Sequence, residues 1–157
     1  MNAGAVTLRP ITVENHLAVM RLKVSTEQKP FVASNADSLA QAYVYGDLAW
    51  PRAIYAGDRP VGFLMLWITP DGHPESVGGK PEYSLWRLMI DAGEQGKGYG
   101  SAAVRLAMEY VRSLPGVEHF TLSYVPKQGN PAPFYERLGF TPTGEMDDDE
   151  VVMRIKL

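Results

Sequence analysis

The sequence comprises 157 residues, of which 45% are hydrophobic and 21% are charged, a balance typical of chains that fold around a hydrophobic core. This length supports a single domain over residues 1–157 and is too short for two domains of ordinary size. The net charge of −3 argues against a nucleic-acid-binding protein, which usually presents a clustered basic surface. The sequence contains no cysteine, which excludes disulfides, thiolate metal sites and a cysteine nucleophile.

Neither membrane insertion nor metal binding is expected. The longest apolar run, residues 61–68, is far shorter than the roughly 20 residues that cross a bilayer. Residues 1–9 lack the basic stretch and long apolar segment of a secretion signal. The histidines lie too far apart in sequence to form a local metal motif. We therefore expect a cytoplasmic protein that does not bind a metal.

The first elements in chain order are a strand and two helices. Alternating residues predict a strand over Val6–Pro10, and Thr12 is a suitable N-cap for the helix that follows. The apolar stripe of that helix consists of Val13, Leu17, Met20 and Val24. A second, short helix ends at Gly46 and is marked by Leu39, Ala42 and Tyr43.

Three strands come next. Residues 52–55 and 61–68 predict an antiparallel hairpin with Gly57 and Asp58 in its turn. Residues 70–81 contain three glycines and three prolines and are interpreted as a loop. A further strand over residues 82–91 leads into a glycine-rich segment.

The second half of the chain alternates helices and strands. A helix with one apolar face follows the glycine-rich segment and ends at Pro115 and Gly116. A strand over residues 117–125 precedes a short helix over residues 131–138, and two final strands, 140–144 and 151–157, flank an acidic turn. The order β, α, α, three strands, α, β, α, two strands predicts a mixed α/β (α+β) fold.

The glycine-rich segment is the first candidate for a functional site. Four glycines lie among residues 93–100, directly before a helix whose first backbone N–H groups lack intrahelical partners. The helix dipole and the charge of Lys97 would both favour an anion such as a pyrophosphate. A glycine-rich turn that serves only to reverse the chain is the alternative interpretation.

Two known phosphate-binding patterns do not fit this segment. A P-loop requires Ser or Thr after its Gly-Lys, but Lys97 is followed by Gly98. A dinucleotide-binding fold places its glycine-rich turn after the first strand, whereas only 57 residues follow Gly100 here.

Residues 95–100, Gln-Gly-Lys-Gly-Tyr-Gly, resemble the Q/R-x-x-G-x-G/A acyl-CoA loop of the GNAT N-acetyltransferase superfamily. Residues 130–140 are similar to the Asn … Tyr … Gly-Phe motif that follows about 30 residues later in that superfamily. Residues 86–91 and 61–63 look most like the spermine/spermidine (diamine) acetyltransferase branch. The resemblance covers essentially the whole chain and implies a central, mostly antiparallel sheet of six to seven strands flanked by about four helices.

The resemblance also implies which residues bind the co-substrate acetyl-CoA. Backbone amides of the loop would hold the pyrophosphate with help from the Ser101 hydroxyl, and strand residues before the loop would hold the pantetheine arm and the thioester oxygen. Asn130 lies five residues before Tyr135, whereas many relatives have seven, so a helix cap is an equal alternative to a cofactor contact. The implied cofactor-binding residues are Leu88, Met89, Ile90, Gln95, Gly96, Lys97, Gly98, Tyr99, Gly100, Ser101, Asn130 and Tyr135.

The implied reaction is attack of a neutral amine on the acetyl thioester, in a ternary complex. Tyr135 matches the tyrosine that protonates the leaving thiolate in the family, with a core aromatic as the alternative. Ser84 occupies the position where protein-lysine acetyltransferases carry a glutamate. Glu82 lies on the same strand face and is the candidate general base, acting through a water, unless it is only an exposed carboxylate.

The acceptor is expected to be a polyamine or another small primary amine. Overall acidity and candidate carboxylates at the entrance, namely Glu27, Asp47, Glu82 and residues 147–150, favour a cation. A protein N-terminus or an antibiotic amine remains an open alternative, as do a non-catalytic acyl-CoA sensor and an adaptor that kept only the fold. Exposed strand edges near the C-terminus are compatible with a homodimer.

Overall fold

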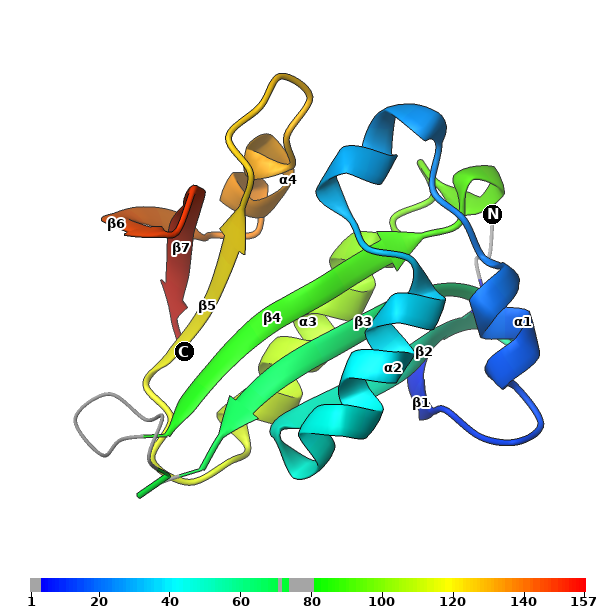
Figure 1. Ribbon diagram of the computed structural model, residues 1–157, viewed down its shortest axis with the longest axis horizontal. Helices are drawn as coiled ribbons and strands as arrows, with labels where there is room; N and C mark the ends of the chain where they lie inside the picture. Colours follow the sequence, from blue (N-terminus) through cyan, green and yellow to red (C-terminus); the bar gives the residue numbers. More distant parts are fainter. Residues whose placement is uncertain (1–3, 71, 74–80) are drawn as a thin grey trace.

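Helices cover both faces of a seven-stranded sheet in the computed structural model, which describes residues 4–70, 72–73 and 81–157 (Figure 1). The strand order is β1-β2-β3-β4-β5-β7-β6, and every neighbouring pair is antiparallel except the parallel pair β4–β5. The strands are β1 (Val6–Pro10), β2 (Ala49–Ala56), β3 (Arg59–Thr69), β4 (Glu82–Ile90), β5 (His119–Tyr124), β6 (Thr141–Asp147) and β7 (Glu150–Lys156).

Four α-helices and three short 3-10 turns connect these strands in the described residues. Helices α1 and α2 lie on one face of the sheet and α3 on the other, while α4 lies beyond the end of β5 (Figure 1). The helices are α1 (His16–Arg21), α2 (Asn35–Tyr45), α3 (Tyr99–Arg112) and α4 (Ala132–Arg137), and the turns are η1 (Thr26–Phe31), η2 (Gly46–Leu48) and η4 (Ala92–Glu94).

The predicted order of elements is confirmed, as are the mixed α/β class and the mostly antiparallel sheet. The hairpin β2–β3 turns at Gly57 and Asp58 as expected, and both of its strands extend beyond the predicted limits. The loop predicted over residues 70–81 lies mostly outside the described residues.

The apolar stripe predicted for the first helix is wrong. Val13 precedes α1 and is 85% exposed, and Leu17 is 55% exposed, whereas Val19 is fully buried. The helix has only six residues and begins after Asn15 rather than Thr12, so a spacing counted from Val13 does not follow one helical face. A similar error affects α2, where Tyr43 is 90% exposed and the polar Asn35 is buried, donating to the carbonyl of Val19 at 2.8 Å.

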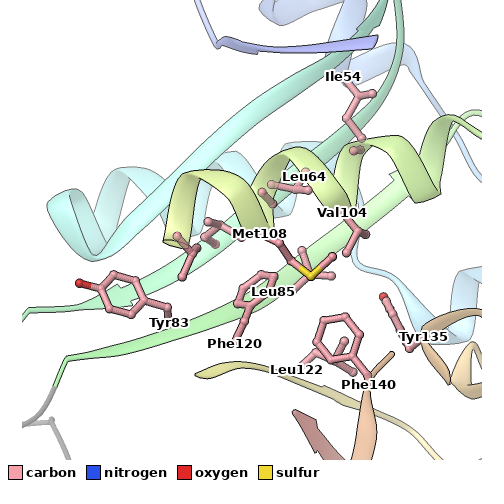
Figure 2. Close-up of a cluster of buried hydrophobic side chains, with 14 of the residues drawn as sticks. Ile54, Leu64, Tyr83, Leu85, Val104, Met108, Phe120, Leu122, Tyr135 and Phe140 are labelled. Atoms are coloured by element: carbon pink, nitrogen blue, oxygen red, sulfur yellow. The ribbon is translucent and has the colours of Figure 1, made fainter. Parts of the chain in front are cut away.

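Two hydrophobic cores of unequal size lie on the two sides of the sheet. The larger core lies between the sheet and α3, where Val104 and Met108 pack over Leu64 and Leu85 (Figure 2). The smaller core, under α1 and α2, is built around Val19, Phe63, Met65 and Met89 with Ala53 and Tyr55. Strands β2, β3 and β4 contribute to both cores, and β3 has the largest share of buried residues among these three strands.

Strands β3 and β4 approach each other closely beside the glycine-rich loop. Gly62 pairs with Ile90, and a Cβ atom at Gly62 would lie 2.4 Å from the carbonyl oxygen of Met89. Only glycine allows this approach without moving backbone. The end of β4 is thereby fixed where it leads into the loop.

Candidate active site

The sheet opens between β4 and β5. These strands pair only at Ser84–Thr121 and Leu85–Leu122, and beyond these residues they diverge toward the top of Figure 1. The backbone edge of β4 at residues 86–90 is therefore not paired with β5. An unpaired edge of this kind can accept an extended ligand as an added strand.

A β-bulge in β4 lies at this opening. Met65 pairs with Arg87 and Leu66 pairs with Leu85, which leaves Trp86 as the extra residue. The bulge changes which residues face each core, because Leu85 and Leu88 both pack on the α3 side while Met89 packs on the α2 side. Arg87 shares a face with Met89 by the period of two and is thus directed to the α2 side.

A cleft of about 1650 Å³ occupies the opening. The glycine-rich loop borders one end, the residues from Val24 to Ala33 form one wall, and α4 with the β6–β7 turn forms the other. Of the sequence-predicted site residues, the structure brings most to this cleft, namely Glu82, Leu88, Met89, Ile90, Gln95, Gly96, Gly98, Tyr99, Gly100, Ser101, Asn130 and Tyr135.

The loop presents free backbone donors to the cleft. No described residue accepts a hydrogen bond from the amides of residues 95–98, and the first intrahelical bond of α3 runs from the amide of Ala102 to the carbonyl of Gly98. Gly96 and Gly98 have positive φ values of 77° and 84°, which orient successive amides in one direction. The loop is thus suited to bind an anionic group at the start of α3.

The sequence led us to expect Lys97 in the cleft, but this residue does not border it. Its Nζ atom lies 2.9 Å from Glu94 Oε2, and its side chain lines a shallow hollow that also includes Arg105. Glu94 in turn accepts two hydrogen bonds from Arg59, at 2.9 and 3.1 Å. These contacts from Arg59 and Lys97 lower the pKa of Glu94, so part of the Lys97 charge is neutralised within the loop.

Gln95 connects the loop to the wall formed by residues 24–33, and Asp91 contacts Lys23, directly before that wall. The side chain of Gln95 donates to Gln28 Oε1 at 2.7 Å and to the carbonyl of Ile90 at 2.9 Å. Close by, Asp91 accepts from the amide of Lys23 at 2.9 Å. Gln95, the first residue of the loop motif, therefore holds the loop against the neighbouring segments and also borders the cleft.

Tyr135 belongs to the core and to the cleft at once. Its ring packs against Phe134 and Phe140 at centroid distances of 5.1 and 5.9 Å, and only 9% of the residue is exposed. No described residue forms a hydrogen bond with its hydroxyl. Burial raises the pKa of the phenol well above its ordinary value, so the hydroxyl stays protonated and able to donate near neutral pH.

Asn130 supports the start of α4. Its Oδ1 accepts from the amide of Ala132 at 2.9 Å, and its Nδ2 donates to the carbonyl of Lys127 at 2.8 Å. The N-cap position itself is occupied by Pro131, so the expected cap is displaced by one residue. Both of the alternatives weighed for Asn130 remain compatible with this geometry, because the residue also borders the cleft.

Polar side chains line the α2 side of the cleft floor. Ser84 forms a hydrogen bond of 2.6 Å with Thr121, and Ser123 donates to the carboxylate of Glu150. Because β4 and β5 are in register at Leu85 and Leu122, Ser123 lies level with the bulge, and so does the Glu150 carboxylate that it holds.

Glu82 lies further away. It is the first residue of β4 and is exposed at the far end of the cleft. It lies six positions before Leu88, which corresponds to roughly 20 Å along the strand. A single water cannot bridge that length, so its role as a base stays a prediction that the geometry does not favour.

Arg87 is a cleft residue that the sequence analysis missed. Its guanidinium donates to the Trp86 carbonyl and to Gln41 Oε1, each at 3.0 Å, while its Nε is buried without a partner among the described residues. Burial lowers its pKa, and none of the ion pairs formed within the described chain involves it. An arginine within the apolar second half of β4, residues 85–90, was the available signal.

The search for other kinds of site is negative within the described ranges. They contain no group of three or more histidine and acidic residues placed to hold a metal ion. None of their helices has both the length and the apolar character needed to cross a bilayer.

The fold and the cleft define a class of protein: an α/β chain whose sheet opens beside a glycine-rich loop with free backbone amides. Comparison with known proteins identifies this class. The profile of the acetyltransferase (GNAT) family matches residues 4–140. Because this match spans most of the sequence, the chain belongs to the acetyltransferase (GNAT) family and is an acetyltransferase.

Relatives and solved structures agree with this assignment. The spermine/spermidine N(1)-acetyltransferase of Bacillus subtilis (strain 168) is 26% identical over 145 residues, which cover 91% of this chain and 92% of that protein. An aminoglycoside acetyltransferase in complex with coenzyme A has a TM-score of 0.76 at 18% identity, covering 97% of this chain and 95% of that one. The PaiA N-acetyltransferase of Thermoplasma acidophilum, also in complex with coenzyme A, has a TM-score of 0.68 at 15% identity, covering 98% and 99%.

Proposed function

We propose that this protein transfers the acetyl group of acetyl-CoA to a small primary amine, in a ternary complex of enzyme, acetyl-CoA and amine. The observation that carries the proposal is the row of free amides at residues 95–98 together with the unpaired edge of β4. The amides suit a diphosphate, and the strand edge suits an extended amide-containing arm. Solved structures that share the fold are described as complexes with coenzyme A, which supports the same co-substrate.

Different residues of the protein would stabilise the thioester oxygen and protonate the departing sulfur. Acetyl-CoA supplies the acetyl thioester when bound. The backbone N–H groups of Leu88 and Met89, next to the bulge, are the candidates to stabilise the thioester oxygen. Tyr135 faces the cleft from α4 with a protonated hydroxyl and would donate to the departing sulfur.

Removal of the amine proton has two candidate groups. Glu82 shares a strand face with Ser84, as a general base at this position would require, but it is remote from Leu88. Glu150 lies level with the bulge, is half-buried, and is held in place by Ser123. We therefore favour Glu150 as the group that accepts the proton, directly or through a water.

The acceptor amine is supported by two observations. The turn between β6 and β7 brings Asp147, Asp148, Asp149 and Glu150 to the rim of the cleft, where they attract cations. Spermine and spermidine are named for relatives at 26% identity, and an aminoglycoside is named for a structural neighbour. A polyamine is therefore one candidate acceptor among several primary amines. Glu27 and Asp47 do not border this cleft and do not contribute to the proposal.

The test is release of free thiol from acetyl-CoA by the purified protein with a panel of primary amines. We expect release with at least one amine and saturable binding of coenzyme A by calorimetry. The Tyr135→Phe variant should lose roughly 100-fold or more in kcat, since a positioned acid contributes about that much, with little change in affinity for coenzyme A.

A non-catalytic acyl-CoA sensor would behave differently in this experiment. It would bind coenzyme A but release no thiol with any amine, and Tyr135→Phe would have no rate to change. An absence of any binding of coenzyme A would contradict both functions.

A further inference from the structure

The cleft that would receive the amine contains a half-buried cation. Arg87 lies on the cleft floor directly before Leu88, beside the expected position of the acetyl group. Its guanidinium uses two nitrogens for the contacts with Trp86 and Gln41, and its Nε is enclosed without a partner among the described residues. Each Nη nitrogen carries a second N–H that these two contacts do not use, and these two N–H groups are the donors available to a ligand.

The negative charges around Arg87 compensate it only in part. Glu150 and Asp37 raise the pKa of Arg87 through space, yet burial outweighs them and the net shift is downward. Neither carboxylate forms an ion pair with the guanidinium. By contrast, Arg59 pairs with Glu94 through two hydrogen bonds. The position next to Arg87 is thus favourable for one further negative group.

A simple polyamine is a poor match for this position. Polyamines carry only positive charges, and a second ammonium group near Arg87 would be repelled. An ammonium group beside Glu150 and a carboxylate beside Arg87 would satisfy both sides of the cleft floor. Trp67 and Trp86 border the same cleft and offer an apolar wall to the rest of the molecule.

We propose that the acceptor is a primary amine that also carries a carboxylate, an amino-acid-type substrate, and that Arg87 binds this carboxylate. The inference rests on the proposed acetyltransferase function and narrows its substrate class. Arg87 then acts as a specificity-determining residue, which holds the carboxylate so that the amine points toward Leu88 and Glu150. Planar guanidinium and carboxylate groups suit each other in such contacts.

The experiment compares amines that differ in one terminal group. One series is 4-aminobutyrate, butylamine and 1,4-diaminobutane, and a second pair is phenylalanine and 2-phenylethylamine. Thiol release gives kcat/KM for each amine at one pH. We expect the carboxylate member of at least one series to exceed the partner that lacks a carboxylate by roughly 10-fold or more, the usual range for hydrogen bonds to a charged group.

Two variants assign the preference to Arg87. Arg87→Gln should lower kcat/KM for the carboxylate member by roughly 10- to 100-fold, mainly through KM, and should reduce its advantage over the amine that lacks a carboxylate. Arg52→Gln is the matched control. Like Arg87, Arg52 donates to the carbonyl of the preceding residue, here Pro51, and it lies over the ring of Trp50, 3.9 Å from the ring centroid. Unlike Arg87, it does not border the cleft. Its substitution should leave the ratio between the two amines as in the wild type.

Each outcome decides the inference. A wild-type preference for 1,4-diaminobutane over every carboxylate-bearing amine would overturn it while leaving acetyl transfer intact. A carboxylate preference that survives in Arg87→Gln would remove Arg87 from the explanation. If that variant fails to fold, Arg87→Lys keeps the charge but loses the planar fork and should retain part of the preference. Absence of thiol with any amine would instead refute the acetyltransferase reaction itself.

Discussion

At the scale of single residues, Tyr135 has a core position that is compatible with the catalytic role proposed for it. Its side chain is part of the larger core, and the residue also lines the cleft. The same burial that stabilises the ring keeps the phenol protonated, because the charged form would be poorly solvated there. A group of this kind can donate to a developing thiolate over the whole neutral range of pH.

The proton acceptor gives a residue-scale prediction. Glu150→Gln should lower kcat by roughly 100-fold, the contribution expected of a general base, and the deficit should shrink as rising pH supplies more neutral amine. Glu82→Gln, at the far end of β4, should cost far less. Profiles of kcat against pH for both variants provide the measurement, and a loss confined to Glu82→Gln would reverse the assignment.

The candidate residues of the loop and of α4 could be predicted from the sequence, but the roles now proposed for Arg87 and Glu150 could not, although Glu150 was among the candidate carboxylates. The loop motif and Tyr135 lie at fixed spacings along one segment. The position of Glu150 depends on the register of three strands, and the direction of Arg87 depends on a bulge that adds Trp86 to β4. Such non-local features leave little trace in one sequence.

At the scale of elements, the loop before α3 depends on backbone conformation more than on space. A Cβ atom at Gly98 would meet nothing within 4 Å, but its φ of 84° is one that other residues rarely adopt. The structure therefore requires glycine there for the direction of the amides.

The element-scale prediction follows from this requirement. Gly98→Ala should weaken binding of coenzyme A by roughly 10-fold or more, since displaced amides would lose hydrogen bonds to a charged group. Gly116→Ala is the control, because Gly116 has a similar φ of 78° beyond the other end of α3 and lies outside the cleft. Both variants should lose similar thermal stability, and calorimetry should separate them. Equal affinity of the two for coenzyme A would contradict a binding role for the loop.

The strands and α3 were predicted well because their apolar patterns are long and regular. The sequence predicted that α1 and α2 are helices, but it did not predict which of their faces are buried. In α1 the helix is too short for its stripe to be meaningful, and in α2 the buried face includes the polar Asn35 and Ser38. Tertiary contacts, such as the bond from Asn35 to Val19, determine these faces.

At the scale of the whole molecule, the unequal cores predict unequal local stability. The layer of α1 and α2 rests on the smaller core and exposes Val13, Leu17, Tyr43 and Val44. Elements with little buried apolar surface open more readily than the rest of a fold. Amide hydrogen exchange should therefore be faster in α1 and α2 than in α3. Equal protection of the three helices would show that the smaller core is as stable as the larger one.

The contacts from Gln28 to Gln95 and from Lys23 to Asp91 have a thermodynamic consequence. They join Gln28, in the wall of the cleft, and Lys23, directly before that wall, to the two ends of segment 91–95, which leads into the free amides of the glycine-rich loop. A change in that segment on occupancy by one substrate therefore alters the site of the other. Such linkage is reciprocal, so whatever factor the first substrate imposes on the affinity of the second, the second must impose equally on the first.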